Sequence, residues 1–223
     1  MAAFAMRKLL LLLTILCSGP CWPDGCEQLP KPSVTVTRFV EPLALNTRYG
    51  YREITHLGSA LARPGEQVLG LTSGKAIARF AINTRLYVDQ SGRWECASPQ
   101  LAVSYGFSPM TVYVAREFPE GSCAFKEIYA HELRHVKAYQ EHLASIENEL
   151  RETLTGRFAT GEPWRGPLGQ TQSRLQQELD ERWLPYIQRA INRAEEAQAL
   201  IDTPEEYARV TDSCKGEIKK ILH

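Results

Sequence analysis

The chain has 223 residues, and its 26 Lys and Arg residues balance its 26 Asp and Glu residues, so the formal net charge is zero. With 43% hydrophobic residues, the composition is that of an ordinary globular domain with a core of its own. A nucleic-acid-binding protein normally carries a basic surface, so the balanced charge argues against that class of partner.

The N-terminus has the pattern of a secretory signal peptide. Arg7 and Lys8 precede a short apolar run that ends at Leu16, and this run is shorter than the roughly 20 residues of a membrane span. We predict a signal peptide over residues 1–21, a Pro-rich linker over 22–33 and a single domain over 34–223. No later stretch is apolar enough to span a membrane, so the mature chain is expected to be periplasmic or secreted. A lipoprotein anchor on Cys17, Cys21 or Cys26 fits less well, because the residues before them suit a lipobox poorly.

Cleavage after Cys21 leaves four cysteines for the mature chain: Cys26, Cys96, Cys123 and Cys214. An even number of cysteines in an exported protein indicates disulfides, and four cysteines allow three pairings. We favour Cys96–Cys123, because both residues flank one β-rich segment. The remaining pair, Cys26–Cys214, would then tie the two chain ends together. The alternative is that some of the four are free buried thiols.

Strand patterns dominate the first half of the chain. Residues Val34–Val40 alternate branched and polar side chains, which is typical of a strand, and residues 49–55 are a weaker candidate. Residues 56–74 are expected to form a loop with at most one short helix. Further strand candidates, around a turn at 90–92, are residues 75–89, 94–96, 101–105 and 110–116.

Helical patterns dominate the second half. Residues 124–154 contain no Gly or Pro and are predicted to form one long helix. After a loop over 156–169, a second helix is expected over 170–201, and Pro185 should kink or split it. Asp202-Thr203-Pro204 is expected to cap a final short helix. Because strands come first and helices second, we predict an α+β fold, with a mostly antiparallel N-terminal sheet packed on a C-terminal pair of long helices.

The first long helix carries the run His131-Glu132-Leu133-Arg134-His135. Two histidines four residues apart lie on one helix face, so both imidazoles can reach the same ion. A catalytic zinc site uses three protein ligands and leaves a position open for water. Glu132 lies beside such a site, where it can act as a general base toward the water. The run therefore predicts Zn²⁺ held by His131 and His135, with Glu132 as the catalytic residue. The alternative is a pair of structural histidines without a metal.

The segment from Ser122 to Val136 resembles the zincin metallopeptidases, in which a strand-bearing part precedes the helix with this motif. It is also similar to uncharacterised bacterial families described as secreted zinc-dependent proteases. The resemblance implies a zincin-like fold and a peptide or protein substrate. It is incomplete, because Ala138 and Glu141 stand where the metzincin type has a glycine and a third histidine.

A third zinc ligand must therefore come from a later helix. If the two long helices are antiparallel around a loop centred near residue 162, residue 135 faces roughly residue 189, which brings Glu195 closest to the histidines. Glu206 is the runner-up. Tyr139 and Tyr207 are candidates for stabilising an oxyanion. We expect the substrate to pair with an edge strand near residues 112–115.

These predictions together describe an exported, disulfide-bonded zinc hydrolase, with endopeptidase as the preferred activity. Two alternatives stay open: a catalytically inactive zinc-binding module, and a metal-free periplasmic interaction module. The sequence contains no pattern that fixes the substrate or the oligomeric state.

Overall fold

The computed structural model describes residues 25–58 and 67–222. The signal peptide predicted over 1–21 lies outside the described residues, as does the start of the predicted linker. Among the helices in the described ranges, none combines the length and apolarity needed to cross a membrane.

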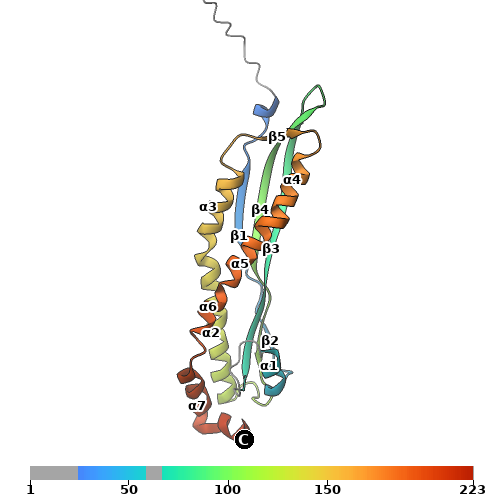
Figure 1. The fold of residues 1–223 in the computed structure, drawn as a ribbon. Coiled ribbons are helices and arrows are strands. Elements are labelled where there is room, and N and C mark those ends of the chain that lie inside the picture. The colour runs from blue at the N-terminus through green and yellow to red at the C-terminus, as the bar shows by residue number, and fades with distance from the viewer. Residues whose placement is uncertain (1–24, 59–66, 223) are drawn as a thin grey trace, which may run out of the picture.

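The fold is α+β, as predicted: one sheet lies against helices that come mainly from the second half of the chain (Figure 1). The strands are β1 (Ser33–Arg38), β2 (Ala44–Asn46), β3 (Gly70–Val88), β4 (Trp94–Val114) and β5 (Trp164–Pro167). The helices are the 3₁₀ turn η1 (Gly25–Gln28), α1 (Tyr51–Leu57), α2 (Cys123–Ser145), α3 (Glu147–Phe158), α4 (Thr171–Glu178), the π turn η2 (Leu179–Trp183), α5 (Leu184–Asn192), α6 (Ala194–Ala199) and α7 (Pro204–Leu222).

Strand β4 is the centre of this five-stranded sheet. Along one edge it pairs antiparallel with β3, from Val88↔Glu95 to Gly70↔Val114. Along its other edge it pairs in parallel with β1 and β2, and antiparallel with β5. The sheet is therefore mixed: most of its residue pairs are antiparallel, as predicted, and β1 and β2 add a parallel part. The hairpin makes β4 run opposite to β3. Strands β1 and β2 also run opposite to β3, so they are parallel to β4 where they pair with it.

Several predicted boundaries also change. Residues 49–55, predicted as a strand, contribute to helix α1, where the Glu53 carboxylate accepts a hydrogen bond from the Gly50 N–H at 2.7 Å and caps the helix start. Strand β3 begins inside the predicted loop, and β4 is one continuous strand rather than three pieces. The long first helix is interrupted only at Ile146, between α2 and α3.

The second helix is split where Pro185 predicts a break. Pro185 has no backbone N–H to donate, and the π turn η2 ends two residues before it. A π turn accommodates one extra residue without ending the helix. The outcome is a chain of short helices, α4 to α6, in place of one straight helix.

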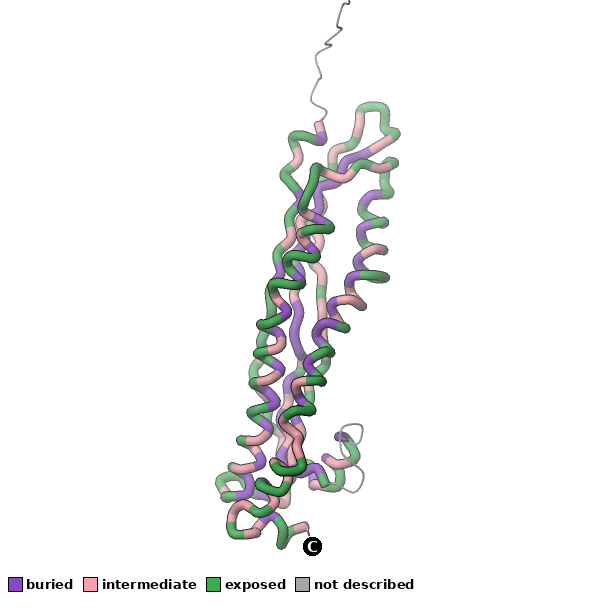
Figure 2. The backbone as a smooth tube through the Cα atoms, turned by 60° about the vertical axis from the view of Figure 1, so that its left-hand side comes forward, coloured by how far each residue is buried: buried purple, intermediate pink, exposed green. Residues whose placement is uncertain are grey.

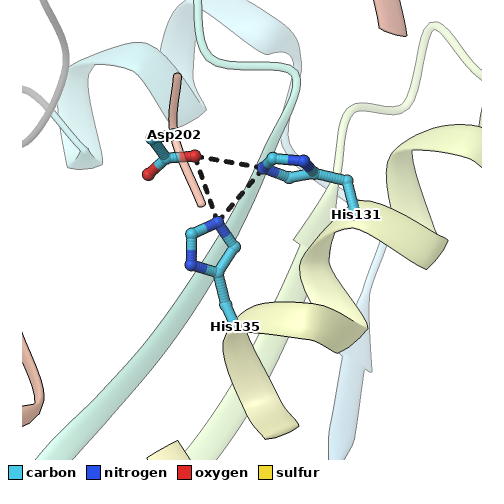
Figure 3. A group of neighbouring side chains, drawn as sticks. All are labelled: His131, His135 and Asp202. Carbon is cyan, nitrogen blue, oxygen red and sulfur yellow. Dashed lines mark hydrogen bonds and ion pairs between the residues drawn. The ribbon is translucent and has the colours of Figure 1, made fainter. Parts of the chain in front are cut away.

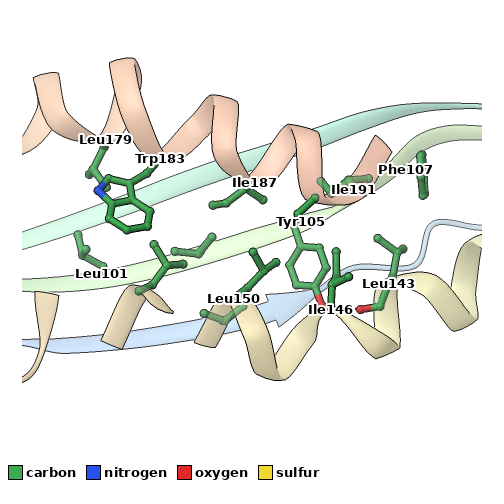
Figure 4. Packing of buried hydrophobic residues seen from close by; sticks show 14 of the residues in the cluster. Leu101, Tyr105, Phe107, Leu143, Ile146, Leu150, Leu179, Trp183, Ile187 and Ile191 are labelled. Carbon is green, nitrogen blue, oxygen red and sulfur yellow. Dashed lines mark hydrogen bonds between the residues drawn. The ribbon is translucent and has the colours of Figure 1, made fainter. Parts of the chain in front are cut away.

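The main core lies between the inner face of the sheet and helices α2 to α5 (Figure 4). Tyr105 of β4 is fully buried there, and its hydroxyl donates a hydrogen bond to the Leu143 carbonyl of α2 at 2.8 Å. Buried positions alternate with less buried ones over residues 101–105 and 110–114 of β4, whereas residues 95–99 are buried in a continuous run. Along the helices, buried positions recur on one side (Figure 2). The labelled core residues of the helices are Leu143, Ile146, Leu150, Leu179, Trp183, Ile187 and Ile191.

All four predicted cysteines form disulfides, but the predicted pairing is wrong. The bonds are Cys26–Cys96 and Cys123–Cys214. Cys96 and Cys123 lie beyond each other's reach because nearly all of β4 separates them, and a strand of this length spans on the order of 60 Å. Instead, the segment before β1 returns alongside β4 and reaches Cys96, while α7 packs back onto the start of α2.

A buried carboxylate at the start of β4 holds the first turn of α4 in place. Glu95 is only 3% exposed, and its Oε1 accepts hydrogen bonds from the backbone N–H and the hydroxyl of Thr171. Burial alone would raise the pKa of Glu95. The hydrogen bonds from Thr171 and from neighbouring backbone N–H groups outweigh that effect and lower the pKa below its usual value.

We expect Glu95→Gln to lower the free energy of unfolding by about 1–3 kcal/mol at pH 7, because it removes a charged acceptor from buried donors. A carboxylate whose pKa is depressed by folding stabilises the protein above its unfolded pKa of about 4.3 and loses that contribution as the pH falls. The difference between wild type and variant should therefore shrink below pH about 4. Urea unfolding of wild type and variant, at pH 7 and again well below pH about 4, measures this difference in the free energy of unfolding. Glu120→Gln is the control, because Glu120 is exposed. A difference that is unchanged by pH would contradict it.

Candidate metal centre

Two histidines of α2 and one aspartate that follows α6 point at a common centre (Figure 3). The Nε2 atoms of His131 and His135 lie 3.1 Å apart. Each of these nitrogens also lies 3.1 Å from Asp202 Oδ1. This group meets the first requirement of a metal site, since two imidazole nitrogens and one carboxylate oxygen converge from separate elements.

The turn that carries Asp202 is fixed by the start of α7. The sequence Asp202-Thr203-Pro204 begins that helix as predicted, with the Thr203 hydroxyl accepting a hydrogen bond from the Glu206 N–H at 3.2 Å. Helix α6 before the turn is anchored on α2 through the fully buried Ala194 and the nearly buried Gln198. The aspartate is therefore held between α6 and α7, which both pack on α2.

The hydrogen bonds of His135 leave its Nε2 without a proton in the neutral ring. The Gln198 amide donates to the His135 carbonyl oxygen at 3.4 Å, which directs the amide oxygen to His135 Nδ1 at 2.6 Å. An amide oxygen only accepts, so Nδ1 carries the proton and Nε2 presents a lone pair. That lone pair faces His131 Nε2 and the Asp202 carboxylate. The lone pair of His135 and the Asp202 carboxylate oxygen are both acceptors, so a proton or a cation between them stabilises the arrangement.

His131 is held through its other nitrogen by charged groups. Its Nδ1 lies 3.2 Å from Glu206 Oε1 and 2.7 Å from the Arg134 guanidinium. Glu206 also pairs with Arg134 and with Arg209 of its own helix. Arg209, assisted by Arg134 and His131, lowers the pKa of Glu206 to about 2, so this carboxylate is charged at neutral pH.

The electrostatics of the centre favour positive charge there. Burial opposes ionisation of Asp202, but its hydrogen bonds with the two histidines hold its pKa well below the usual range. Burial also opposes protonation of His135, yet the neighbouring Asp202 and Glu132 carboxylates raise its pKa above the usual value. Two nitrogens and one carboxylate oxygen, in a negatively charged surrounding, form a donor set that suits a first-row divalent ion.

Glu132 lies next to this centre, on the inner side of α2. It is 4% exposed, and its Oε2 accepts a hydrogen bond from the Thr72 hydroxyl of β3 at 2.9 Å. Burial raises the pKa of Glu132, an effect that the two histidines partly offset. Gly70 makes room for this side chain, because a Cβ at position 70 would lie 2.6 Å from Glu132 Oε1.

The centre opens into a cavity of about 700 Å³ between the start of β3 and helix α7. All three candidate ligands and Glu132 line it. The wall on the sheet side includes Leu71 and Thr72, and the wall on the α7 side includes Tyr207, Val210 and Leu222. The cavity is large enough to admit a segment of polypeptide or a ligand of comparable size.

The structure gathers some of the predicted site residues and separates others. His131, Glu132 and His135 share the cavity, and so do Tyr139 and Tyr207. Glu195 also lines the cavity, but Asp202 is the carboxylate that reaches the two Nε2 atoms. The runner-up Glu206 contacts His131 on the opposite side of the ring, at Nδ1.

Glu195 was predicted as the third ligand because a wrong register between the two long helices was assumed. Gln198, rather than a residue near 189, faces His135. Helix α3 continues to Phe158, beyond the predicted end at residue 154, and the π turn adds one residue to the second helix, so the residue that faces His135 lies further along the chain. The sequence did mark Asp202, but as part of a helix cap, and the presence of a carboxylate in that cap was the available signal for a ligand.

The predicted substrate strand also needs correction. Residues 112–115 end the central strand β4 or follow it directly, and Val112 and Val114 are fully buried and pair with β3. The strand that borders the cavity is β3, through Gly70, Leu71 and Thr72. In the described ranges, no strand pairs with the edge of β3 that faces away from β4.

Comparisons of the chain with protein-family profiles, with curated proteins and with solved structures find no match. The zincin-like fold therefore stays a prediction from the local resemblance.

Proposed function

We propose that this protein is an exported zinc-dependent hydrolase, and that its substrates are peptides or proteins. The observation that carries the proposal is the convergence of His131 Nε2, His135 Nε2 and Asp202 Oδ1 at 3.1 Å from one another, in a cavity that also contains the buried Glu132. The two disulfides agree with an oxidising compartment outside the cytoplasm.

In this proposal His131, His135 and Asp202 hold the metal. Zinc bound there would supply a Lewis acid that makes water nucleophilic at neutral pH and polarises the carbonyl under attack. Glu132 accepts the proton that the water loses and delivers it to the leaving amine. Thr72 holds the Glu132 carboxylate in a fixed orientation for both transfers.

The edge of β3 is where we place the substrate. An extended peptide can add to a free strand edge through its backbone groups, and Leu71 and Thr72 would bring it past Glu132. Backbone pairing accepts many sequences, so this arrangement supports a peptidase more directly than a hydrolase for small molecules.

The test is metal-dependent cleavage by the purified chain. Elemental analysis should find about one zinc per chain, as expected from the ligand group His131, His135 and Asp202 among the described residues. Incubation with a peptide library, followed by mass spectrometry, should show cleavage that a chelator abolishes and added zinc restores. A protein that binds zinc without cleaving any peptide would contradict the hydrolase and support an inactive zinc-binding module. A protein without metal would support the metal-free interaction module.

Gln198 should tune the affinity of the site through His135. We expect Gln198→Ala to weaken zinc binding by about 10–100-fold, because the partner that orients a ligating imidazole is lost. Competition with a chromophoric chelator measures the dissociation constant. Gln176→Ala is the matched control, since Gln176 lies exposed on α4 and bonds only to Asp180. Equal affinities for the two variants would contradict the role of Gln198.

A further inference from the structure

Helix α7 lies antiparallel along the first half of α2 and completes the metal centre. Three contacts follow one register: Glu206 meets His131 and Arg134, Arg209 meets Glu127 at 2.9 Å, and Cys214 is bonded to Cys123. The covalent contact is the last of the series, at the first residue of α2. Because Asp202 and Glu206 lie at one end of α7, the disulfide fixes the helix that keeps both carboxylates at the histidines.

Apart from the disulfide, α7 is held by a small buried surface and by charged contacts near its start. Of its residues, only Val210 and Ile218 are buried, and its ion pairs with α2 are at least partly open to solvent. Exposed ion pairs contribute little stability. The helix is also interrupted at the disulfide, where Cys214, Lys215 and Gly216 have positive φ angles. The segment before this break therefore depends on the disulfide more than a deeply packed helix would.

This inference rests on the proposed metal site. We propose that the Cys123–Cys214 disulfide is required to assemble that site, so that the chain binds zinc tightly only after this bond has formed. The bond forms by thiol–disulfide exchange: the two thiols give two electrons and two protons to a partner disulfide, which becomes a dithiol. In a reducing cytoplasm both thiols stay reduced. A hydrolase built in this way stays metal-poor until it has been exported.

The chain provides its own matched control, because Cys26–Cys96 closes a loop of similar length without touching the site. The two bonds join residues 70 and 91 positions apart. We would compare the oxidised full chain with Cys123→Ser/Cys214→Ser and with Cys26→Ser/Cys96→Ser. Serine leaves no new thiol that could bind metal. The probe is Zn²⁺ alone, measured by chelator competition, with circular dichroism and hydrogen exchange of α7 as measurements of folding.

Loss of the Cys123–Cys214 bond should weaken zinc binding by about tenfold or more, the effect of losing support for ligands, and should speed exchange of the α7 amides. Loss of Cys26–Cys96 should leave the affinity within about threefold, well below that effect. If all three proteins bind zinc with equal affinity, or if both double substitutions weaken zinc binding equally, the role of the Cys123–Cys214 disulfide is overturned. The hydrolase proposal is not affected by that result. If zinc binding depends on the Cys123–Cys214 bond but no peptide is cleaved, only the hydrolase proposal is overturned. Absence of zinc from the oxidised wild type would overturn both.

Discussion

Replacing His135 with alanine is expected to abolish stoichiometric zinc binding and all zinc-dependent cleavage. His135 supplies one of the three converging donor atoms, and the remaining pair, His131 and Asp202, leaves a site with too few ligands for tight binding. The loss should exceed the roughly 10–100-fold that removal of an outer partner costs. Elemental analysis and chelator competition on wild type and variant measure it.

His142→Ala is the matched control for this substitution. His142 lies on the same helix, two turns from His135, and its Nε2 contacts the Ala190 carbonyl oxygen at 2.8 Å rather than the centre. The control should keep its zinc and its activity, even if it loses some stability. If His135→Ala retained one zinc per chain, the metal would be elsewhere and the proposed function would fall.

Replacing Glu132 with glutamine should separate metal binding from chemistry. The amide has nearly the same shape and can still accept the Thr72 hydrogen bond, and Glu132 is not among the three converging donors. We therefore expect unchanged zinc content. The amide cannot accept the proton from water, so the cleavage rate should fall by about 10²–10⁴-fold. Zinc analysis and initial cleavage rates on the same preparation measure both effects.

The control for Glu132→Gln is Glu141→Gln on the solvent side of α2, where Glu141 pairs only with Lys137 at 3.6 Å. It makes the same chemical change far from the cavity and should leave the cleavage rate unaltered. Cleavage at the wild-type rate by Glu132→Gln would exclude Glu132 as the proton carrier. Loss of zinc from that variant would instead indicate that Glu132 supports the ligands.

The sequence predicted the parts of the fold that depend on local pattern. The α+β class, the two histidines on one face of α2, and the break near Pro185 all follow from side-chain periodicity and backbone chemistry within a few residues. Residues 49–55 were mistaken for a strand because aromatic and branched residues mask a helix whose start depends on the Glu53 cap. A capping hydrogen bond outweighs weak intrinsic propensity over so short an element.

The parts that depend on distant contacts could not be predicted in the same way. Choosing Asp202 over Glu195 required the helix register, which the extension of α3 to Phe158 and the π turn shift. Choosing Cys123–Cys214 required knowing that α7 folds back on α2. Neither fact has a local signal, because each depends on how residues 60 or more positions apart meet.

The long hairpin of β3 and β4 also implies an order of folding. Its strands are joined by a turn at Asp89–Arg93 and can zip together from neighbouring residues, whereas Thr72–Glu132 and His135–Gln198 close loops of 60 and 63 residues. Closing long loops costs entropy before any contact compensates for it, so non-local contacts form slowly. We therefore expect the hairpin to form early and the metal centre last. A chain trapped before that final step would carry its histidines without the aspartate, so the donor set of the candidate metal centre would be incomplete.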